Sequence, residues 1–274
     1  MIIPKKSLGQ NFLSDENVAR NIVERLNPEA DHLLMEIGAG TGALTKHLVG
    51  TVRDLIVVEI DRRATDLLKE RFSGGCRVLQ EDILAVDPDR LVAEYGRPLR
   101  VVGNIPYYIT SEILFWMFDH RPAFRDATLM MQLEVARRLV AVKKTKEYGI
   151  LSIFTRFYTE PEMLFRVSRN SFFPRPNVDS AVIRLTFRKD VPAHNEHLLR
   201  SIVRGTFGKR RKMLHNSLRS MGFPEEQLAA TGMDLKKRPE EWGIEEFLEL
   251  TGRLGKKSRD DTFSKMEEAR TKSK

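Results

Sequence analysis

Short apolar runs rich in β-branched residues recur through the first 188 residues and alternate with amphipathic stretches. In chain order the runs are HLLMEI, DLIVVEI, CRVLQ, LRVVGN, ATLMMQ, GILSIFTRFY and SAVIRLTF. The stretches between them carry apolar residues at helical spacing, such as Ala64, Leu67, Leu68 and Phe72. This alternation predicts a Rossmann-like α/β fold, a mostly parallel sheet of seven strands with helices on both faces.

The pattern changes towards the C-terminus. The last two runs are separated by prolines and too little chain for a crossover helix, which predicts an antiparallel edge to the sheet. Past Lys189 only helical spacing remains, and the last residues are rich in lysine and poor in apolar side chains. We therefore expect an α/β domain over residues 1–188, a small helical domain over 189–252 and a disordered basic tail over 253–274.

Composition narrows the class of protein. The 46 Lys and Arg residues outnumber 38 Asp and Glu, and the net charge of +8 favours an anionic partner without identifying it. Cys76 is the single cysteine, which excludes an internal disulfide and a cysteine-clustered zinc site, and the six histidines show no metal spacing. No apolar run approaches the ~20 residues of a membrane span. We expect a soluble, cytoplasmic monomer that binds no metal.

A glycine-rich turn, Gly38-Ala39-Gly40-Thr41-Gly42, joins the first run to a helical stretch, where a ligand can approach the backbone. Glu59 closes the next run, and Asp82 and Asn104 follow at similar intervals, each about one strand-helix unit. All should lie along the carboxyl edge of the sheet, where open α/β folds bind ligands. Taken alone, each acid is better explained as a helix N-cap. The series together predicts a binding site.

Two ligands fit such a turn. A dinucleotide requires a G-x-G-x-x-G turn for its pyrophosphate, but here the third glycine comes one residue early and Glu36 precedes the first. S-adenosyl-L-methionine has no phosphate and carries a cationic sulfonium, so acids beside the turn suit it. Glu59 would then hold the ribose hydroxyls, and Asp82 would accept from the adenine amine. The alternative is a nicotinamide-dependent oxidoreductase, which would bind NAD and not S-adenosyl-L-methionine.

Asn104-Ile105-Pro106-Tyr107 follows the fourth run and suits methyl transfer to a planar amine. The side-chain carbonyl of Asn104 can accept one amine hydrogen and a backbone carbonyl at Ile105 or Pro106 the other, which favours a pyramidal, nucleophilic nitrogen. Pro106 fixes the local backbone, Tyr107 would stack on the base, and Phe172 is the candidate for its other face. The alternative for this motif is a simple turn, with Tyr107 in the core.

These features together resemble the ribosomal RNA small-subunit adenine dimethyltransferase family (KsgA/RsmA and Dim1-like), over about residues 4 to 252. The resemblance rests on Ser7-Leu8-Gly9-Gln10-Asn11-Phe12-Leu13, Glu36-Ile37-Gly38-Ala39-Gly40-Thr41-Gly42, Val58-Glu59-Ile60-Asp61, Glu81-Asp82-Ile83, Gly103-Asn104-Ile105-Pro106-Tyr107 and Phe172-Phe173-Pro174-Arg175-Pro176-Asn177-Val178-Asp179-Ser180-Ala181. It implies a class I methyltransferase fold in which Asn11 and Leu13 close over the cofactor and Gly38 contacts its methionine part. It also implies dimethylation of N6 of two adjacent adenosines near the 3′ end of small-subunit (16S) rRNA, within a pre-ribosomal particle, and a role in ribosome assembly.

The helical domain carries a basic band. From His197 to Pro224 there are seven basic residues and no acid, and Lys209, Arg210, Arg211 and Lys212 form a continuous run. We expect this run to contact RNA phosphates, although a solvated basic face is the alternative. Two other functions stay open: methylation of large-subunit RNA, as in the related resistance enzymes, and RNA binding without catalysis.

Overall fold

The computed structural model describes residues 2–5, 8–192 and 194–255. The chain divides into two compact units, residues 1–140 with 158–189, and residues 141–157 with 190–274. The sequence pattern predicts residues 141–157 as part of the α/β domain, whereas the structure groups them with the C-terminal helices. Residues 253–255, expected in the tail, complete a helix over 244–255 in which Leu254 is buried. The remainder of the predicted tail lies outside the described residues.

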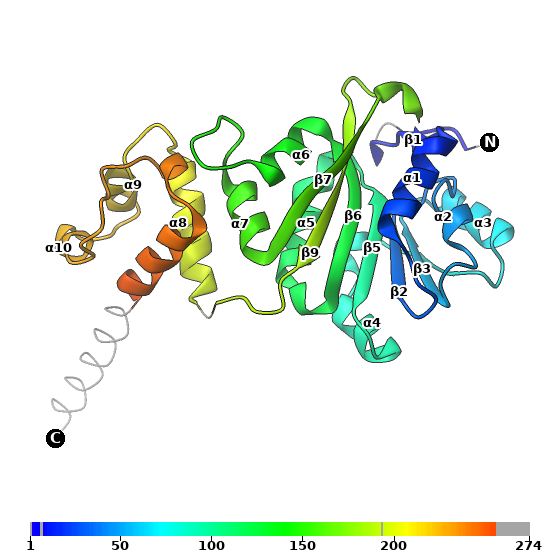
Figure 1. The fold of residues 1–274 in the computed structure, drawn as a ribbon, viewed down its shortest axis with the longest axis horizontal. Coiled ribbons are helices and arrows are strands. Elements are labelled where there is room, and N and C mark those ends of the chain that lie inside the picture. The colour runs from blue at the N-terminus through cyan, green and yellow to red at the C-terminus, as the bar shows by residue number, and fades with distance from the viewer. Residues whose placement is uncertain (1, 6–7, 193, 256–274) are drawn as a thin grey trace. The chain divides into compact units, whose positions relative to one another are not determined.

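The described part of unit 1 holds the seven-stranded sheet, in the order β4-β3-β2-β5-β6-β9-β7 (Figure 1). Its strands are β2 (Leu33–Ile37), β3 (Asp54–Glu59), β4 (Arg77–Gln80), β5 (Leu99–Asn104), β6 (Phe124–Gln132), β7 (Thr159–Val167) and β9 (Ser180–Phe187). The pairs among β4, β3, β2, β5 and β6 are parallel, and β9 is antiparallel to both β6 and β7. The expected α/β fold with an antiparallel edge is confirmed.

The described helices of unit 1 are α1 (Glu16–Leu26), α2 (Thr45–Leu48), α3 (Arg62–Arg71), α4 (Pro88–Tyr95), α5 (Thr110–Asp119) and α6 (Leu133–Val140). Helix α1 precedes the sheet, and the other helices of this unit lie between its strands along the chain. The inner strand β2, which lies between β3 and β5, is buried at every position, as expected for a parallel strand covered on both faces. Within the described residues, no helix has the length and apolar character to cross a membrane.

One predicted strand is wrong. GILSIFTRFY forms helix α7 (Ile150–Tyr158), and the edge strand β7 is the following, more polar segment. The helix is favoured because Ile153, Phe154 and Phe157 recur at helical spacing and are all buried. β7 contains Pro161, which an edge strand tolerates because one side of its backbone needs no ladder partner.

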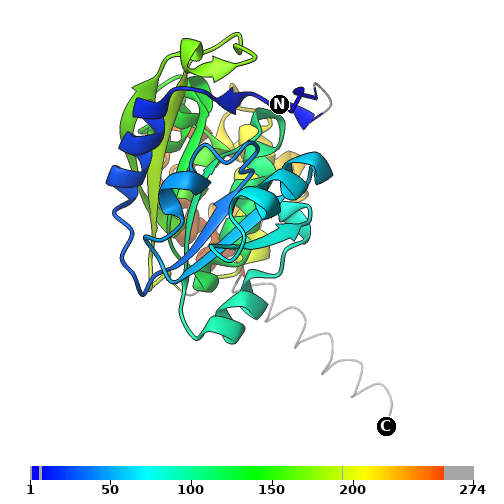
Figure 2. The ribbon, with the colours of Figure 1, turned by 90° about the vertical axis from the view of Figure 1, so that its right-hand side faces the viewer.

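A second small sheet lies at the end of unit 1. Strand β1 (Phe12–Leu13) pairs antiparallel with β8 (Phe172–Phe173), which bonds the N-terminal segment to the connection between β7 and β9. Figure 2 shows the dark blue N-terminal segment running past the sheet at this level. Residues 8–13 are thereby fixed over the carboxyl edge of the sheet.

Unit 2 contains helices and turns. Besides α7 and the helix over 244–255, its described residues form α8 (Glu196–Phe207), α9 (Leu214–Ser220) and α10 (Glu225–Ala229). Leu199, Ile202 and Val203 of α8 are buried, and the ring of Phe207 contacts those of Tyr148 and Phe247. These contacts bring residues 141–157 into the same core as the C-terminal helices.

Candidate active site

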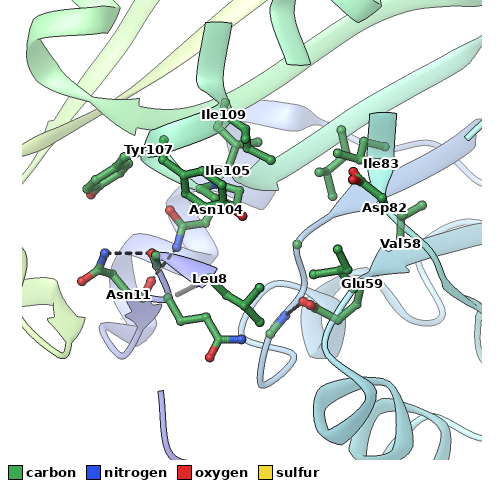
Figure 3. A pocket seen from close by; sticks show the side chains of 18 of the residues that line it. Leu8, Asn11, Val58, Glu59, Asp82, Ile83, Asn104, Ile105, Tyr107 and Ile109 are labelled. Carbon is green, nitrogen blue, oxygen red and sulfur yellow. Dashed lines mark hydrogen bonds between the residues drawn. The ribbon is translucent and has the colours of Figure 1, made fainter. Parts of the chain in front are cut away.

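A cavity of about 960 Å³, its open mouth included, lies at the carboxyl ends of β2, β3, β4 and β5 (Figure 3). Its wall consists of the N-terminal residues 8–12, the glycine turn, the end of β3, residues 81–84 and residues 104–109. The predicted edge of the sheet is therefore the edge that is hollowed, because parallel strands 2 to 5 bring their following loops together there.

The predicted site residues divide into two groups. Those that line this cavity are Asn11, Gly38, Gly40, Glu59, Asp82, Asn104, Pro106 and Tyr107. Leu13 and Phe172 do not line it: they are 7% and 4% exposed and face each other across the β1–β8 pair. Leu13 instead lines a smaller adjoining cavity of about 290 Å³, together with Glu36 and Leu44.

The glycine turn requires its glycines. Gly38 and Gly40 have φ angles of +68° and +56°, a region that side chains with a Cβ rarely adopt. A Cβ on Gly40 would also lie 2.8 Å from the ring of Phe12, which covers the turn. The backbone of the turn is thus exposed to the cavity on one side and packed against the N-terminal segment on the other.

Glu59 holds the turn in place. One carboxylate oxygen accepts the N–H of Gly40 and the other that of Asp61, each at 2.9 Å. Burial raises the pKa of Glu59, and the two N–H donors oppose this shift. Each oxygen keeps a second lone pair, so the carboxylate can still accept a hydrogen bond from a ligand in the cavity.

Asp82 caps a helix and lines the cavity as well. Its Oδ1 accepts the N–H of Leu84 at 3.0 Å, at the start of the short 3-10 helix Ile83–Ala85. The N-cap interpretation is therefore correct and does not exclude the binding role. Within the described residues Oδ2 has no hydrogen-bond partner, and Figure 3 shows the carboxylate beside the cavity.

The amide of Asn104 has a defined orientation. Its Nδ2 donates to the backbone carbonyl of Asn11 at 2.9 Å, so its Oδ1, which has no partner among residues 2–5, 8–192 and 194–255, is an available acceptor in the cavity wall (Figure 3). The Pro106 carbonyl already accepts from the Ile109 N–H at 3.3 Å and the Thr110 hydroxyl at 3.2 Å. Of the two backbone acceptors considered from the sequence, Ile105 is therefore the one left without a partner among the described residues.

Tyr107 is held by a residue of strand β9 to which sequence reasoning gave no role. Its hydroxyl lies 2.6 Å from the hydroxyl of Ser180, a fully buried residue at the start of β9. Burial raises the pKa of the Tyr107 phenol, so the group stays neutral and able to donate. Ser180 belongs to the Val178–Ala181 segment, and only the fold places it beside Tyr107.

The N-terminal segment is fastened by Asp61, a second residue without a predicted role. The Gln10 amide donates to Asp61 Oδ2 at 3.0 Å, and Lys5 lies 3.9 Å from Oδ1. The Arg63 guanidinium holds the pKa of Asp61 well below its usual range. Asp61 therefore stays ionised at physiological pH and keeps residues 8–12 over the cavity.

Glu36 is a buried acid below the turn. Its side chain is 1% exposed, and its carboxyl group accepts a hydrogen bond of 2.7 Å from the Thr45 hydroxyl. Burial, more than the nearby charge of Glu59, raises the pKa of Glu36 to about 7. The adjoining cavity thus ends on a carboxyl group that a cationic ligand would ionise.

Comparison with known proteins gives one consistent result. The family model for ribosomal RNA adenine dimethylase matches residues 3–256. The ribosomal RNA small subunit methyltransferase A of Chlorobium phaeobacteroides is 43% identical over 249 residues, covering 91% of this chain and 93% of the relative. A dimethyladenosine transferase structure from Plasmodium falciparum has a TM-score of 0.78 at 25% identity, covering 90% of this chain and 98% of that one. The structure of the 23S rRNA methyltransferase ErmE has a TM-score of 0.66 at 31% identity, and the match covers 89% of this chain and 100% of that one.

The raised pKa of Glu36 predicts a pH-dependent stability. Between the unfolded value of 4.5 and about 7, the unfolded chain has lost a proton that the folded chain keeps. The free energy of unfolding should therefore fall as pH rises through this window, by up to about 1.4 kcal/mol per pH unit, and level off above it. Glu36→Gln keeps an acceptor for Thr45 and should flatten the slope.

Urea unfolding of both proteins across the same pH window measures this difference. Glu59 shifts in the same direction, so the variant should retain part of the slope. An unchanged pH dependence in Glu36→Gln would show that Glu36 ionises normally in the folded protein.

Proposed function

The chain belongs to the ribosomal RNA adenine dimethylase family, and from that membership we propose a specific reaction. It transfers methyl groups from S-adenosyl-L-methionine to N6 of two adjacent adenosines near the 3′ end of small-subunit rRNA, in an assembling ribosomal particle. The observation that carries the proposal is the fixed amide of Asn104, whose Oδ1 is an available acceptor in the wall of the cavity.

The cavity fits the cofactor. Glu59 has spare lone pairs for the ribose hydroxyls, and Asp82 has an unpaired oxygen for the adenine amine. Gly38 and Gly40 present backbone without side chains, and Asn11 closes the opposite wall. When bound, the cofactor supplies an electrophilic methyl group on a sulfonium. The acids Glu36 and Glu59 on this side of the turn favour that cation, and they would oppose the pyrophosphate of a dinucleotide.

The residues of the Asn104 motif act on the amine. The N6 lone pair of adenine is delocalised into the ring until its hydrogens are held, and Asn104 Oδ1 can accept one of them. The Ile105 carbonyl is the second acceptor, because the Pro106 carbonyl is already occupied. Both acceptors are preorganised by bonds within the fold, so holding the amine requires little rearrangement.

Tyr107 is suited to stack on the target base. Its ring lines the cavity, and its hydroxyl is anchored on Ser180. Phe172 remains the candidate for the other face of the base. Because its ring is buried beneath β1, that role requires the β1–β8 pair to open when RNA binds.

Small-subunit RNA is favoured over large-subunit RNA as the substrate. The relative that acts on the small subunit is 43% identical, whereas the 23S rRNA methyltransferase structure is 31% identical. In unit 2, Lys209, Arg211 and Lys212 are exposed and suited to phosphate contacts. A monomer without metal remains our expectation.

Asn104→Ala should abolish methylation, because it removes an acceptor on the reacting amine. Loss of one such preorganised group costs about 100- to 1,000-fold in turnover in comparable sites. The assay is incorporation of label from S-adenosyl-L-methionine into small subunits that lack adenosine dimethylation, with large-subunit RNA for comparison.

The same preparation should keep its affinity for small subunits, measured by filter binding, since Asn104 lies outside the basic band. Normal turnover in Asn104→Ala would exclude the proposed role. Label confined to large-subunit RNA with the wild-type protein would assign the chain to the other substrate.

The Tyr107–Ser180 hydrogen bond should contribute to turnover through the orientation of the ring. Tyr107→Phe and Ser180→Ala each remove it and should each lower kcat by about 2- to 10-fold, the range of one hydrogen bond. Because both remove the same bond, the double variant should be little worse than either single one. Single-turnover rates measure this cycle, and fully multiplicative effects would show that the bond has no catalytic role.

A further inference from the structure

Arg210, in the basic run of unit 2, forms its hydrogen bonds with other residues of the protein. Arg210 Nε donates to Glu240 Oε2 at 2.5 Å, Nη1 to the Lys146 carbonyl at 2.7 Å and Nη2 to the Thr145 carbonyl at 2.8 Å. A guanidinium has five N–H donors in a fixed fork, and these bonds use all three nitrogens. Arg210 therefore connects the basic run to the loop over residues 142–147.

Glu240 fixes the same loop through its backbone. The Lys144 N–H donates to the Glu240 carbonyl at 2.9 Å, while Lys144 has a φ angle of +70°. A left-handed lysine is unfavourable, so this conformation depends on the bonds around it. Arg210 and Glu240 together hold the loop in one defined shape.

This arrangement joins two segments that each carry a pair of cations, because Arg210 bonds to the carbonyls of Thr145 and Lys146. Lys144 and Lys146 of the loop, and Arg211 and Lys212 next to Arg210, are all exposed. Within the part of the chain that the structure describes, none of the four has a carboxylate within ion-pair distance. Glu147 is the exposed acid of the loop, and Glu240 is neutralised by Arg210.

We propose that the loop over residues 142–147 and the run over residues 209–212 form one phosphate-binding surface for rRNA. Lys144 and Lys146 contact phosphates, whereas Arg210 contacts no RNA and positions the loop. The inference rests on the proposed function, since it names further residues that bind the same RNA.

Phosphates bind readily beside cations that have no carboxylate partner, because their negative charge is compensated there. Binding also releases the counterions condensed on the RNA, which contributes a large part of the affinity. A solvated lysine pair on a freely moving loop would give little of this gain, because ordering long side chains and backbone on binding opposes it. Here the loop is ordered in advance by two bonds from the Arg210 side chain to loop carbonyls and by one backbone bond to Glu240, and Glu240 in turn accepts a bond from Arg210.

The first test is the salt dependence of binding to unmethylated small subunits and to naked small-subunit rRNA. Lys144→Ala/Lys146→Ala should weaken binding about 10-fold or more at moderate salt and reduce the log–log salt slope by roughly 1 to 2, one step for each lost phosphate contact. Lys236→Ala/Lys237→Ala removes the same charge from other exposed lysines of unit 2 and is the control. An equal loss in the control, or no loss in the loop variant, would overturn the proposal.

The second test separates positioning from contact by keeping the charge. Arg211→Lys should retain the slope, because a lysine still binds phosphate. Arg210→Lys cannot bridge two carbonyls and Glu240, so it should lose slope like the loop variant. Retention of slope in Arg210→Lys, or a loss with subunits that is absent with naked rRNA, would overturn the proposal.

The proposed function fails separately. If the wild-type protein transfers methyl groups to neither substrate but binds small subunits with a salt slope that the loop variant lowers, the proposed function fails and the phosphate-binding surface stands. If the wild type methylates small subunits with strong salt dependence while the loop variant keeps the full slope, only the phosphate-binding surface is refuted.

Discussion

The site depends on the carboxylate of Glu59 more than on any other single group. It lies at the end of β3 and accepts the N–H of Gly40 from the neighbouring connection and the N–H of Asp61 from its own. Asp61 in turn binds Gln10 and so fastens the N-terminal segment. Three segments far apart in sequence are thereby tied to one buried acid at the carboxyl edge of the sheet. A charged group in this position is costly to bury, and the bonds it accepts are what make it tolerable.

Hydrogen bonds within the fold also fix the groups of the reacting motif, Asn104 to Tyr107. Asn104 donates to Asn11 and is left with one acceptor, Pro106 has its carbonyl occupied, and Tyr107 is anchored on Ser180. Each partner comes from a different part of the fold: the N-terminal segment, α5 and β9. The motif contributes the residue types, and the packing around it decides which atoms face the cavity.

Much of this could be predicted from the sequence because parallel βα units repeat at regular length. The spacing of Gly38, Glu59, Asp82 and Asn104 was sufficient to place them at one edge, and all four line the cavity. Ser180 and Asp61 could not be found in this way, since their roles depend on partners brought close only by tertiary structure. The prediction of a strand at α7 is wrong because a short, strongly apolar run does not distinguish a buried strand from a helix. The burial of Ile153, Phe154 and Phe157, which identifies the helical face, is seen only in the structure.

The charged residues of a sequence do not by themselves show which side chains are available to bind another molecule. Arg210 and Arg211 are adjacent and chemically identical, yet one donates to Glu240 and two carbonyls while the other is exposed and has no carboxylate partner among the described residues. The difference follows from the turn after α8, which brings the Arg210 side chain to the carbonyls of Thr145 and Lys146. A run of basic residues therefore indicates that an anion can be bound, and the internal acceptors decide which of its members remain available to bind it.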